Sequence, residues 1–213
     1  MIGEVCMLVT SIEKVGKYKY KVFLDMEYAF FLSWKELCFW NIKEQEELTQ
    51  KQYDTIMHEA VLEKCKRKAI ALLKDKSRTE YELRQKLLMH LYTHEIVEQV
   101  LDYVKYYHYI DDERYVENFI ETHKRVHSKR WIENKLKQKG IKKEQYDLYF
   151  QNDYCEENAI KKAIRKKMKG KNIESITEKN KLLAYLYRQG FSGSGIQKYI
   201  RQYENECCLE LEE

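Results

Sequence analysis

A pair of apolar residues one helical turn apart recurs three times along the chain, and this repeat constrains the fold more than any other feature. Successive pairs are offset by 49 and 50 residues: Leu83 with Leu87, Ile132 with Leu136, and Leu182 with Leu186. A unit of two or three helices cannot bury its apolar faces alone, whereas stacked copies can. The repeat predicts a mainly α-helical protein of tandem three-helix repeats forming an elongated, curved body.

The ends of these helices are marked by glycine and by capping residues, because the chain contains no proline. Gly140 and Gly190 follow the second and third apolar pairs, where a left-handed residue suits a helix end. Leu91 stands at the corresponding place in the first copy. We therefore expect the same turn three times, twice with glycine and once with leucine.

The first 48 residues have a different pattern. Residues 5–10, 17–24 and 28–32 are β-prone, and residues 17–24 alternate between apolar and lysine positions. Alternation with period two is typical of a strand that is buried on one face. Ser33 and Glu36 then form a capping box that opens a short helix. The chain is expected to begin with a small β-rich module that contains one short helix.

Further capping boxes, Thr49 with Gln52 and Thr79 with Glu82, open the helical part, and Thr93 is predicted to cap another helix. No strand is expected from Thr49 onward. The predicted organisation is a β-rich module at 1–48, helical repeats at 49–110, 111–152 and 153–205, and an acidic tail at 206–213.

The charge distribution is more informative than the formal net charge of +4. Residues 124–143 hold nine Lys or Arg and one acid, residues 161–171 hold seven and no acid, and the last ten residues hold five Glu and no base. Such basic arrays attract phosphates or acidic protein surfaces. The alternative is a lysine-rich surface that is merely solvated.

Helical spacing predicts that five cations of the segment 161–171 line one exposed face of a helix, with others bracketing a turn in the second repeat. The predicted partner- and DNA-binding residues are Lys124, Arg125, Lys129, Arg130, Lys135, Lys161, Lys162, Arg165, Lys166 and Lys169. Trp131 lies among them and is expected to make a core or inter-repeat contact.

Catalytic and metal sites are not predicted. Two histidine pairs, His90 with His94 and His123 with His127, have the spacing of helical metal ligands, but no third ligand completes either. The adjacent Asp111 and Asp112 suit a helix start better than a carboxylate pair. With no phosphate loop or nucleophile elbow, we expect neither enzyme activity nor a cofactor.

Localisation is predicted from three absences. The six cysteines show no CxxC pair, the first ten residues do not form a secretory signal, and no stretch has the length of a membrane span. We expect a cytoplasmic protein with reduced thiols and no membrane partner.

Three segments together resemble the RecX family: residues 69–83, 109–115 and 131–141. The resemblance is strongest over about residues 66–141. The residues that carry the family pattern, and are expected to be structural, are Arg78, Glu82, Leu83, Tyr109, Ile110, Asp111, Asp112 and Arg114. Two positions depart from the family: His108 and Met26 stand where it usually has glycine, which implies a backbone cost if they are left-handed.

The resemblance implies a regulator that binds the RecA–single-stranded DNA filament and inhibits or modulates RecA, acting in recombination, DNA repair and the SOS response. The partners it implies are the RecA filament and single-stranded DNA, with double-stranded DNA left open, and we expect a monomer. The residues alone leave two alternatives: a general DNA-binding helical protein without a RecA partner, and a helical-repeat protein–protein adaptor.

Overall fold

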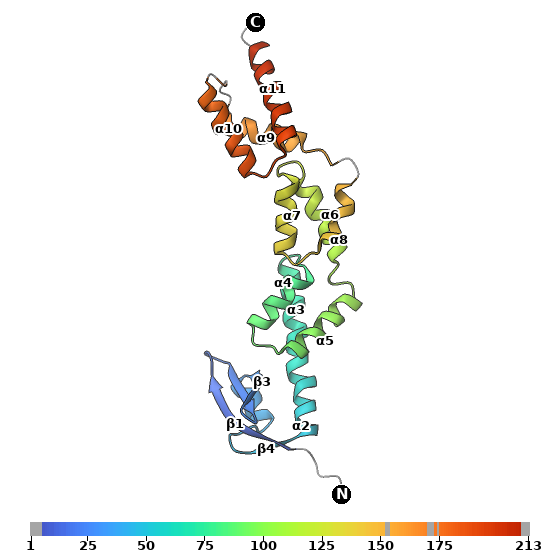
Figure 1. The fold of residues 1–213 in the computed structure, drawn as a ribbon. Coiled ribbons are helices and arrows are strands. Elements are labelled where there is room, and N and C mark those ends of the chain that lie inside the picture. The colour runs from blue at the N-terminus through green and yellow to red at the C-terminus, as the bar shows by residue number, and fades with distance from the viewer. Residues whose placement is uncertain (1–5, 152–153, 170–172, 174, 210–213) are drawn as a thin grey trace. The chain divides into compact units, whose positions relative to one another are not determined.

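The structure is a computed structural model that describes residues 6–151, 154–169, 173 and 175–209, with no side chains described beyond residue 204. The chain forms two compact units that divide between Asp111 and Asp112 (Figure 1). Unit 1 carries a small sheet and the first helical repeat, and unit 2 carries the second and third repeats. The predicted class, mainly helical with three tandem three-helix repeats behind a small β-containing module, is confirmed.

The sheet of unit 1 is antiparallel, with strand order β3-β2-β1-β4. The strands are β1 (Cys6–Lys14), β2 (Tyr20–Leu24), β3 (Glu27–Leu32) and β4 (Glu47–Thr49). The predicted alternation in β2 is confirmed, because Val22 and Leu24 are buried and Lys21 is only half-buried. β4 was not predicted. Its three residues are too short for a period-two pattern, and pairing with β1 defines it.

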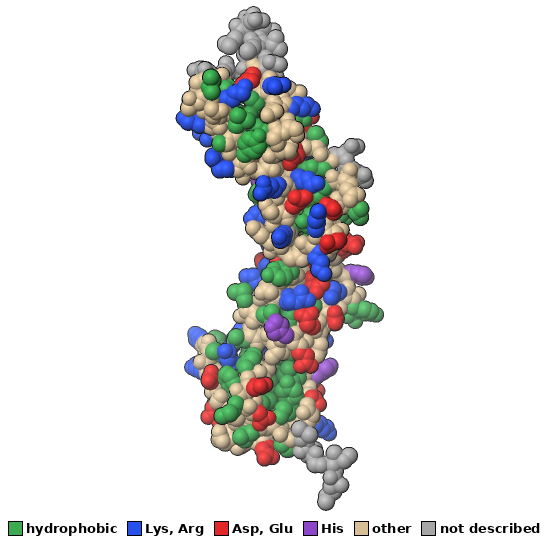
Figure 2. All heavy atoms as spheres, in the orientation of Figure 1, with side chains coloured by type: hydrophobic (Ala, Val, Ile, Leu, Met, Phe, Trp, Pro, Cys, Tyr) green, Lys and Arg blue, Asp and Glu red, His purple; other side chains and the backbone are tan. Residues whose placement is uncertain are grey.

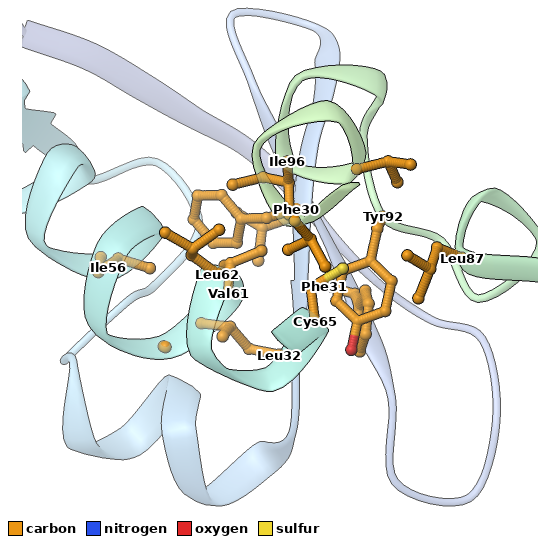
Figure 3. Close-up of a cluster of buried hydrophobic side chains, with 14 of the residues drawn as sticks. Phe30, Phe31, Leu32, Ile56, Val61, Leu62, Cys65, Leu87, Tyr92 and Ile96 are labelled. Carbon is orange, nitrogen blue, oxygen red and sulfur yellow. The ribbon is translucent and has the colours of Figure 1, made fainter. Parts of the chain in front are cut away.

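Helix α1 (Trp34–Phe39) follows the sheet and has the predicted capping box between Ser33 and Glu36. The long helix predicted from Thr49 is present with one difference. It consists of α2 (Gln50–Thr55), a π-helical segment (Ile56–Leu62) and α3 (Glu63–Asp75). The π-helical segment buries four residues, Ile56, Ala60, Val61 and Leu62. Figure 3 shows Ile56, Val61 and Leu62 gathered with Phe30 and Leu32 of β3, so packing on the sheet accompanies this departure from α-helical spacing.

The first repeat is completed by α4 (Glu80–Met89) and α5 (His94–Tyr106). The capping box of Thr79 and Glu82 is confirmed. Thr93 occupies the N-cap position of α5, but the prediction that its side chain caps the helix is wrong: the hydroxyl is buried and accepts no capping hydrogen bond. Leu83 and Leu87 are fully buried in a core shared with the sheet.

Unit 2 contains two further cores. The second repeat is built from α6 (Asp112–His123), α7 (Lys129–Gln138), α8 (Lys143–Tyr146) and a 3-10 turn (Asp147–Phe150) around Ile132 and Leu136. The third is built from α9 (Glu157–Met168), α10 (Ile176–Arg188) and α11 (Gly193–Leu209) around Leu182 and Leu186. The start of the predicted acidic tail continues α11, and residues 210–213 lie outside the described residues.

The predicted left-handed turns are confirmed. Leu91, Gly140 and Gly190 have φ angles of 71°, 79° and 86°, so the same turn recurs in all three repeats. The two departures from the family pattern are left-handed as well, with φ of 54° at His108 and 70° at Met26. A side chain in this region is strained because its Cβ approaches the backbone, and glycine avoids the strain.

His108 allows a direct test of this strain, because its side chain is exposed. We expect His108→Gly to raise the free energy of unfolding by about 0.5–1 kcal/mol, the relief of strain minus the added entropy of glycine in the unfolded chain. His108→Ala keeps the Cβ and should change it little. Urea unfolding of the three proteins measures the difference, and a Gly variant no more stable than the Ala variant would contradict the explanation.

Gly190 should respond in the opposite direction. A Cβ at this position would lie 3.0 Å from Ser128 Oγ and 3.2 Å from Arg130 Cβ, in addition to the unfavourable φ. Gly190→Ala is therefore expected to lower the stability of unit 2 by about 1–3 kcal/mol. Urea unfolding checks the value, and a loss below about 0.5 kcal/mol would show that the turn relaxes without strain.

Candidate nucleic-acid interface

The start of α7 fixes where the basic residues of the second repeat lie. Ser128 is buried at the N-cap position, where its hydroxyl accepts a hydrogen bond from the Trp131 N–H (3.2 Å). The same hydroxyl donates to the carbonyl of Gln189, at the end of α10 (2.6 Å). One side chain thus begins α7 and ties it to the third repeat. Lys129, Arg130 and Lys135 are held on this anchored helix.

Helix α9 presents the second group of cations. Ala159, Ile160, Ala163 and Ile164 form its buried face, as the sequence pattern predicted. The opposite side carries the exposed Lys162, Arg165 and Lys166, and the exposed Lys167 extends it. This arrangement follows from the 3.6-residue period, which separates an apolar stripe from a polar one.

The prediction of five cations along one helix face is wrong in two respects. α9 ends at Met168, and Lys169 is a left-handed C-cap residue with φ of 52°, so it does not continue the row. Lys161 lies on the helix but is half-buried, with its Nζ 2.7 Å from a carboxylate oxygen of Glu157. The row of exposed cations is therefore shorter than the spacing suggested.

Other predicted binding residues have local partners. Lys124 pairs with Glu121, the Lys129 Nζ lies 3.9 Å from Glu133, and Lys135 donates to Gln138 Oε1 (3.1 Å). Arg125 and Arg130 are exposed. Surface ion pairs such as those of Lys124 and Lys129 contribute little to stability, so these two lysines can exchange the neighbouring acid for a stronger anion.

A column of aromatic rings, most of them stacked, lies among the basic residues of the second repeat and was not predicted from the sequence. Its members are every fourth residue from Tyr115 through Phe119, His123 and His127 to Trp131. The ring centroids of Phe119 and His123 are 4.1 Å apart, and those of His127 and Trp131 are 3.6 Å apart. The four-residue spacing of aromatic residues was the available signal. The expectation that Trp131 makes a core contact is confirmed, since it packs against the second-repeat core.

Cations surround this column. Lys139 Nζ lies 5.3 Å from the ring centroid of Tyr115, and Lys135 Nζ lies 5.8 Å from that of Trp131. Lys162 and Lys166 of α9 act electrostatically on His127. Lysines and aromatic residues together are typical of surfaces that bind single-stranded nucleic acid. Here the rings stack largely on one another, so the column serves as a rigid support for the ammonium groups more than as a platform for bases.

The environment of His127 favours its neutral form. Burial is the largest cause that lowers the pKa of His127. The nearby charges of His123, Lys166 and Lys162 lower that pKa further. The His123 Nδ1 lies 2.8 Å from the carbonyl oxygen of Phe119. Within the described residues no group of three or more His, Cys, Asp or Glu side chains could hold a metal ion.

The family-pattern residues lie at structural positions. Arg78 Nε donates to the carbonyl of Leu72 (3.2 Å), Glu82 completes a capping box, and Leu83 belongs to the core. Ile110 is buried next to the exposed Tyr109. α6 begins at Asp112, with Asp111 directly before it and the exposed Arg114 in its first turn. Across the described helices, none is both long and apolar enough to cross a membrane.

Comparison with known proteins gives consistent matches. The models of the first, second and third three-helix domains of RecX match residues 65–103, 111–147 and 156–200. A "Regulatory protein RecX" of Caldanaerobacter subterraneus is 32% identical over 91% of this chain and 98% of its own length. Another, from Clostridium tetani, is 30% identical over 90% of this chain and 91% of its own. A crystal structure of regulatory protein RecX covers 92% of this chain and 99% of its own, with 25% identity and a TM-score of 0.60.

His127, one of the two histidines in the ring column, should make unit 2 less stable in acid. In the unfolded chain His127 takes up a proton near its ordinary pKa of about 6.5, whereas the folded environment lowers that pKa. The unfolded state therefore binds more protons as the pH falls through 6.5, and stability falls with it until the pH passes below the folded pKa. NMR titration of the imidazole should give a midpoint below 6.5 for His127. His127→Gln should reduce the loss of stability between pH 7.5 and 5.5, and a midpoint above 6.5 would contradict the assignment.

Proposed function

We propose that this chain, which belongs to the RecX family, binds the RecA–single-stranded DNA filament and inhibits or modulates RecA. The observation that carries the proposal is the set of exposed cations on α9, Lys162, Arg165 and Lys166. The start of α9 is tied to the start of the basic α7, because the Lys129 N–H donates a hydrogen bond to Glu156 (2.7 Å). The relatives named regulatory proteins support a regulatory role. The proposal adds that this regulatory role is exerted by binding to RecA and to the DNA within the filament.

The chemistry of unit 2 suits a filament partner. In the described residues, Arg125, Arg130, Lys162, Arg165 and Lys166 form no ion pair with an acid of this chain. Figure 2 shows basic side chains spread over the visible face of unit 2, with acidic ones among them. Lysine and arginine arrays bind phosphates without reading sequence, and the interspersed acids offer contacts to basic residues of a protein. A ligand that contacts both DNA and neighbouring RecA subunits can hold one filament state and slow its conversion to another.

Two other functions remain as alternatives. A general DNA-binding protein would bind DNA as well without RecA as with it, and an adaptor would leave the lysines solvated and show no DNA affinity at moderate salt. We also expect the protein to act as a monomer and without catalysis. Each alternative gives a different result in one assay.

That assay is the single-stranded-DNA-dependent ATPase of RecA, with the purified chain titrated at less than one copy per RecA and DNA binding measured in parallel. We expect inhibition at these low ratios. The variant Lys162→Glu/Arg165→Glu/Lys166→Glu should require at least tenfold more protein for the same inhibition, because it reverses three charges on the surface that meets the phosphates. Circular dichroism should show an unchanged helix content.

The matched control is Lys181→Glu/Arg188→Glu/Arg201→Glu, which makes the same change of net charge at exposed positions of α10 and α11. It should inhibit nearly as well as the unmodified chain. An equal loss of RecA inhibition in both variants would mean that the effect depends on net charge and not on the α9 surface. Full inhibition by the α9 variant would remove this surface from the proposal. No inhibition by the unmodified chain, with DNA binding retained, would favour the general DNA-binding alternative.

A further inference from the structure

Unit 1 contains a second gathering of cations, which the charge distribution along the sequence does not reveal because its members come from separate segments. Its members are Lys19 just before β2, Lys21 in β2, Lys64 and Lys68 in α3, Lys86 in α4, and His90 at the C-cap of α4. We call these six residues the unit 1 cationic cluster. All except the exposed Lys86 are half-buried.

Specific contacts bring these segments together. The ring centroids of Phe31 in β3 and Tyr92 after α4 lie 5.1 Å apart. The Tyr28 hydroxyl donates a hydrogen bond to the carbonyl of Leu91. Figure 3 shows Phe31 and Tyr92 next to Cys65 of α3, in the core that the sheet and the helices share. The end of α4, which carries His90, is therefore fixed against the sheet.

Three of the five ammonium groups lie over rings of the sheet. Lys19 Nζ and Lys64 Nζ lie 4.7 and 5.2 Å from the same ring centroid, that of Phe31. Lys21 Nζ lies 5.6 Å from the ring centroid of Tyr28. A cation over an aromatic face is attracted to the ring but keeps its charge. These contacts order the lysines without neutralising them.

The cluster has little negative charge to balance it. Lys64 pairs with Glu36, with 2.6 Å between Nζ and a carboxylate oxygen. Among the described residues, Lys19, Lys21, Lys68 and Lys86 form no ion pair with any acid. Burial lowers the pKa of Lys19, and Lys68 and Lys64 lower that pKa further. Burial likewise lowers the pKa of His90, helped by Lys68, Lys19 and Lys86. The cations therefore repel one another, and a bound anion would relieve the repulsion.

We propose that the unit 1 cationic cluster binds the backbone phosphates of a nucleic-acid strand, which gives unit 1 a nucleic-acid contact of its own. The cluster contains five lysines and no arginine. A lysine ammonium is a compact point charge that can bind a phosphate in many geometries. Lysines placed next to aromatic rings, as Lys19 and Lys64 are next to Phe31, are typical of surfaces that bind single-stranded nucleic acid. The members of the cluster come from three segments, which suits several successive phosphates better than one small anion. The chemistry of the cluster supports a nucleic-acid strand in general, and the choice of DNA as that strand rests on the proposed function.

The test is binding of the full chain, without RecA, to a fluorescein-labelled 30-nucleotide oligo-dT. We expect Lys68→Glu/Lys86→Glu to weaken binding at least tenfold at about 0.1 M salt. The slope of log K against log salt should become shallower by one or more, since each phosphate contact of a single strand contributes about 0.7. The control, Lys51→Glu/Lys74→Glu, makes the same charge change at exposed lysines of α2 and α3 outside the cluster. It should weaken binding less than threefold.

A milder pair, Lys68→Gln/Lys86→Gln, removes the charges without reversing them and covers the case in which the Glu variant does not fold. It should give an intermediate loss of affinity. Unchanged affinity in the Gln pair, or equal loss in the cluster and control variants, would overturn the proposal. Intact DNA affinity with loss of RecA inhibition would also overturn it, in favour of an acidic protein surface. Loss of DNA affinity in the cluster variants, with no effect of the unmodified chain on RecA, would uphold this inference and reject the proposed function.

Discussion

Burial of one apolar stripe per helix is the constraint on which the rest of the structure depends. The three leucine and isoleucine pairs that define the repeat are all buried, with at most 1% of any of these side chains exposed. Helices this short are not stable in isolation, so packing of these stripes must hold them. Once the stripe is fixed inward, the period of the helix fixes the opposite face outward. The exposed position of Lys162, Arg165 and Lys166 is thus a consequence of burying Ile160 and Ile164.

The sequence was sufficient where structure is determined locally. The capping boxes at Ser33, Thr49 and Thr79, and the left-handed turns at Gly140 and Gly190, each depend on a few neighbouring residues, and all were predicted. Prediction failed where the local structure depends on contacts with residues that are distant in the sequence. β4 exists through pairing with β1, and the π-helical segment accompanies packing on β3. Thr93 has the residue type of a cap, but its hydroxyl is buried without a partner.

The candidate site shows the same division. The sequence could identify the dense basic segments of the second and third repeats, because their charges are close along the chain. The pairing of Glu157 with Lys161 was missed although its four-residue spacing within a helix is a local signal. That α9 ends before Lys169 was not predicted either. The ring column needed both the four-residue spacing within α6 and the turn that brings Trp131 back onto it. The unit 1 cationic cluster had no signal in any single segment, since the contacts of Phe31 and Tyr28 assemble it.

Both groups of cations contain lysines that lie over aromatic rings, and this affects what those lysines can do. A lysine paired with a carboxylate, such as Lys124 with Glu121, has its field largely cancelled. A lysine over a ring, such as Lys19 over Phe31 or Lys135 near Trp131, is held in place while its positive field still reaches the solvent. The abundance of tyrosine, 18 residues in this chain, provides many such rings. Ordering a lysine before a ligand arrives removes part of the entropy lost on binding. Ring-supported lysines therefore suit phosphate binding better than the same number of lysines free in solvent, although the net charge would be identical.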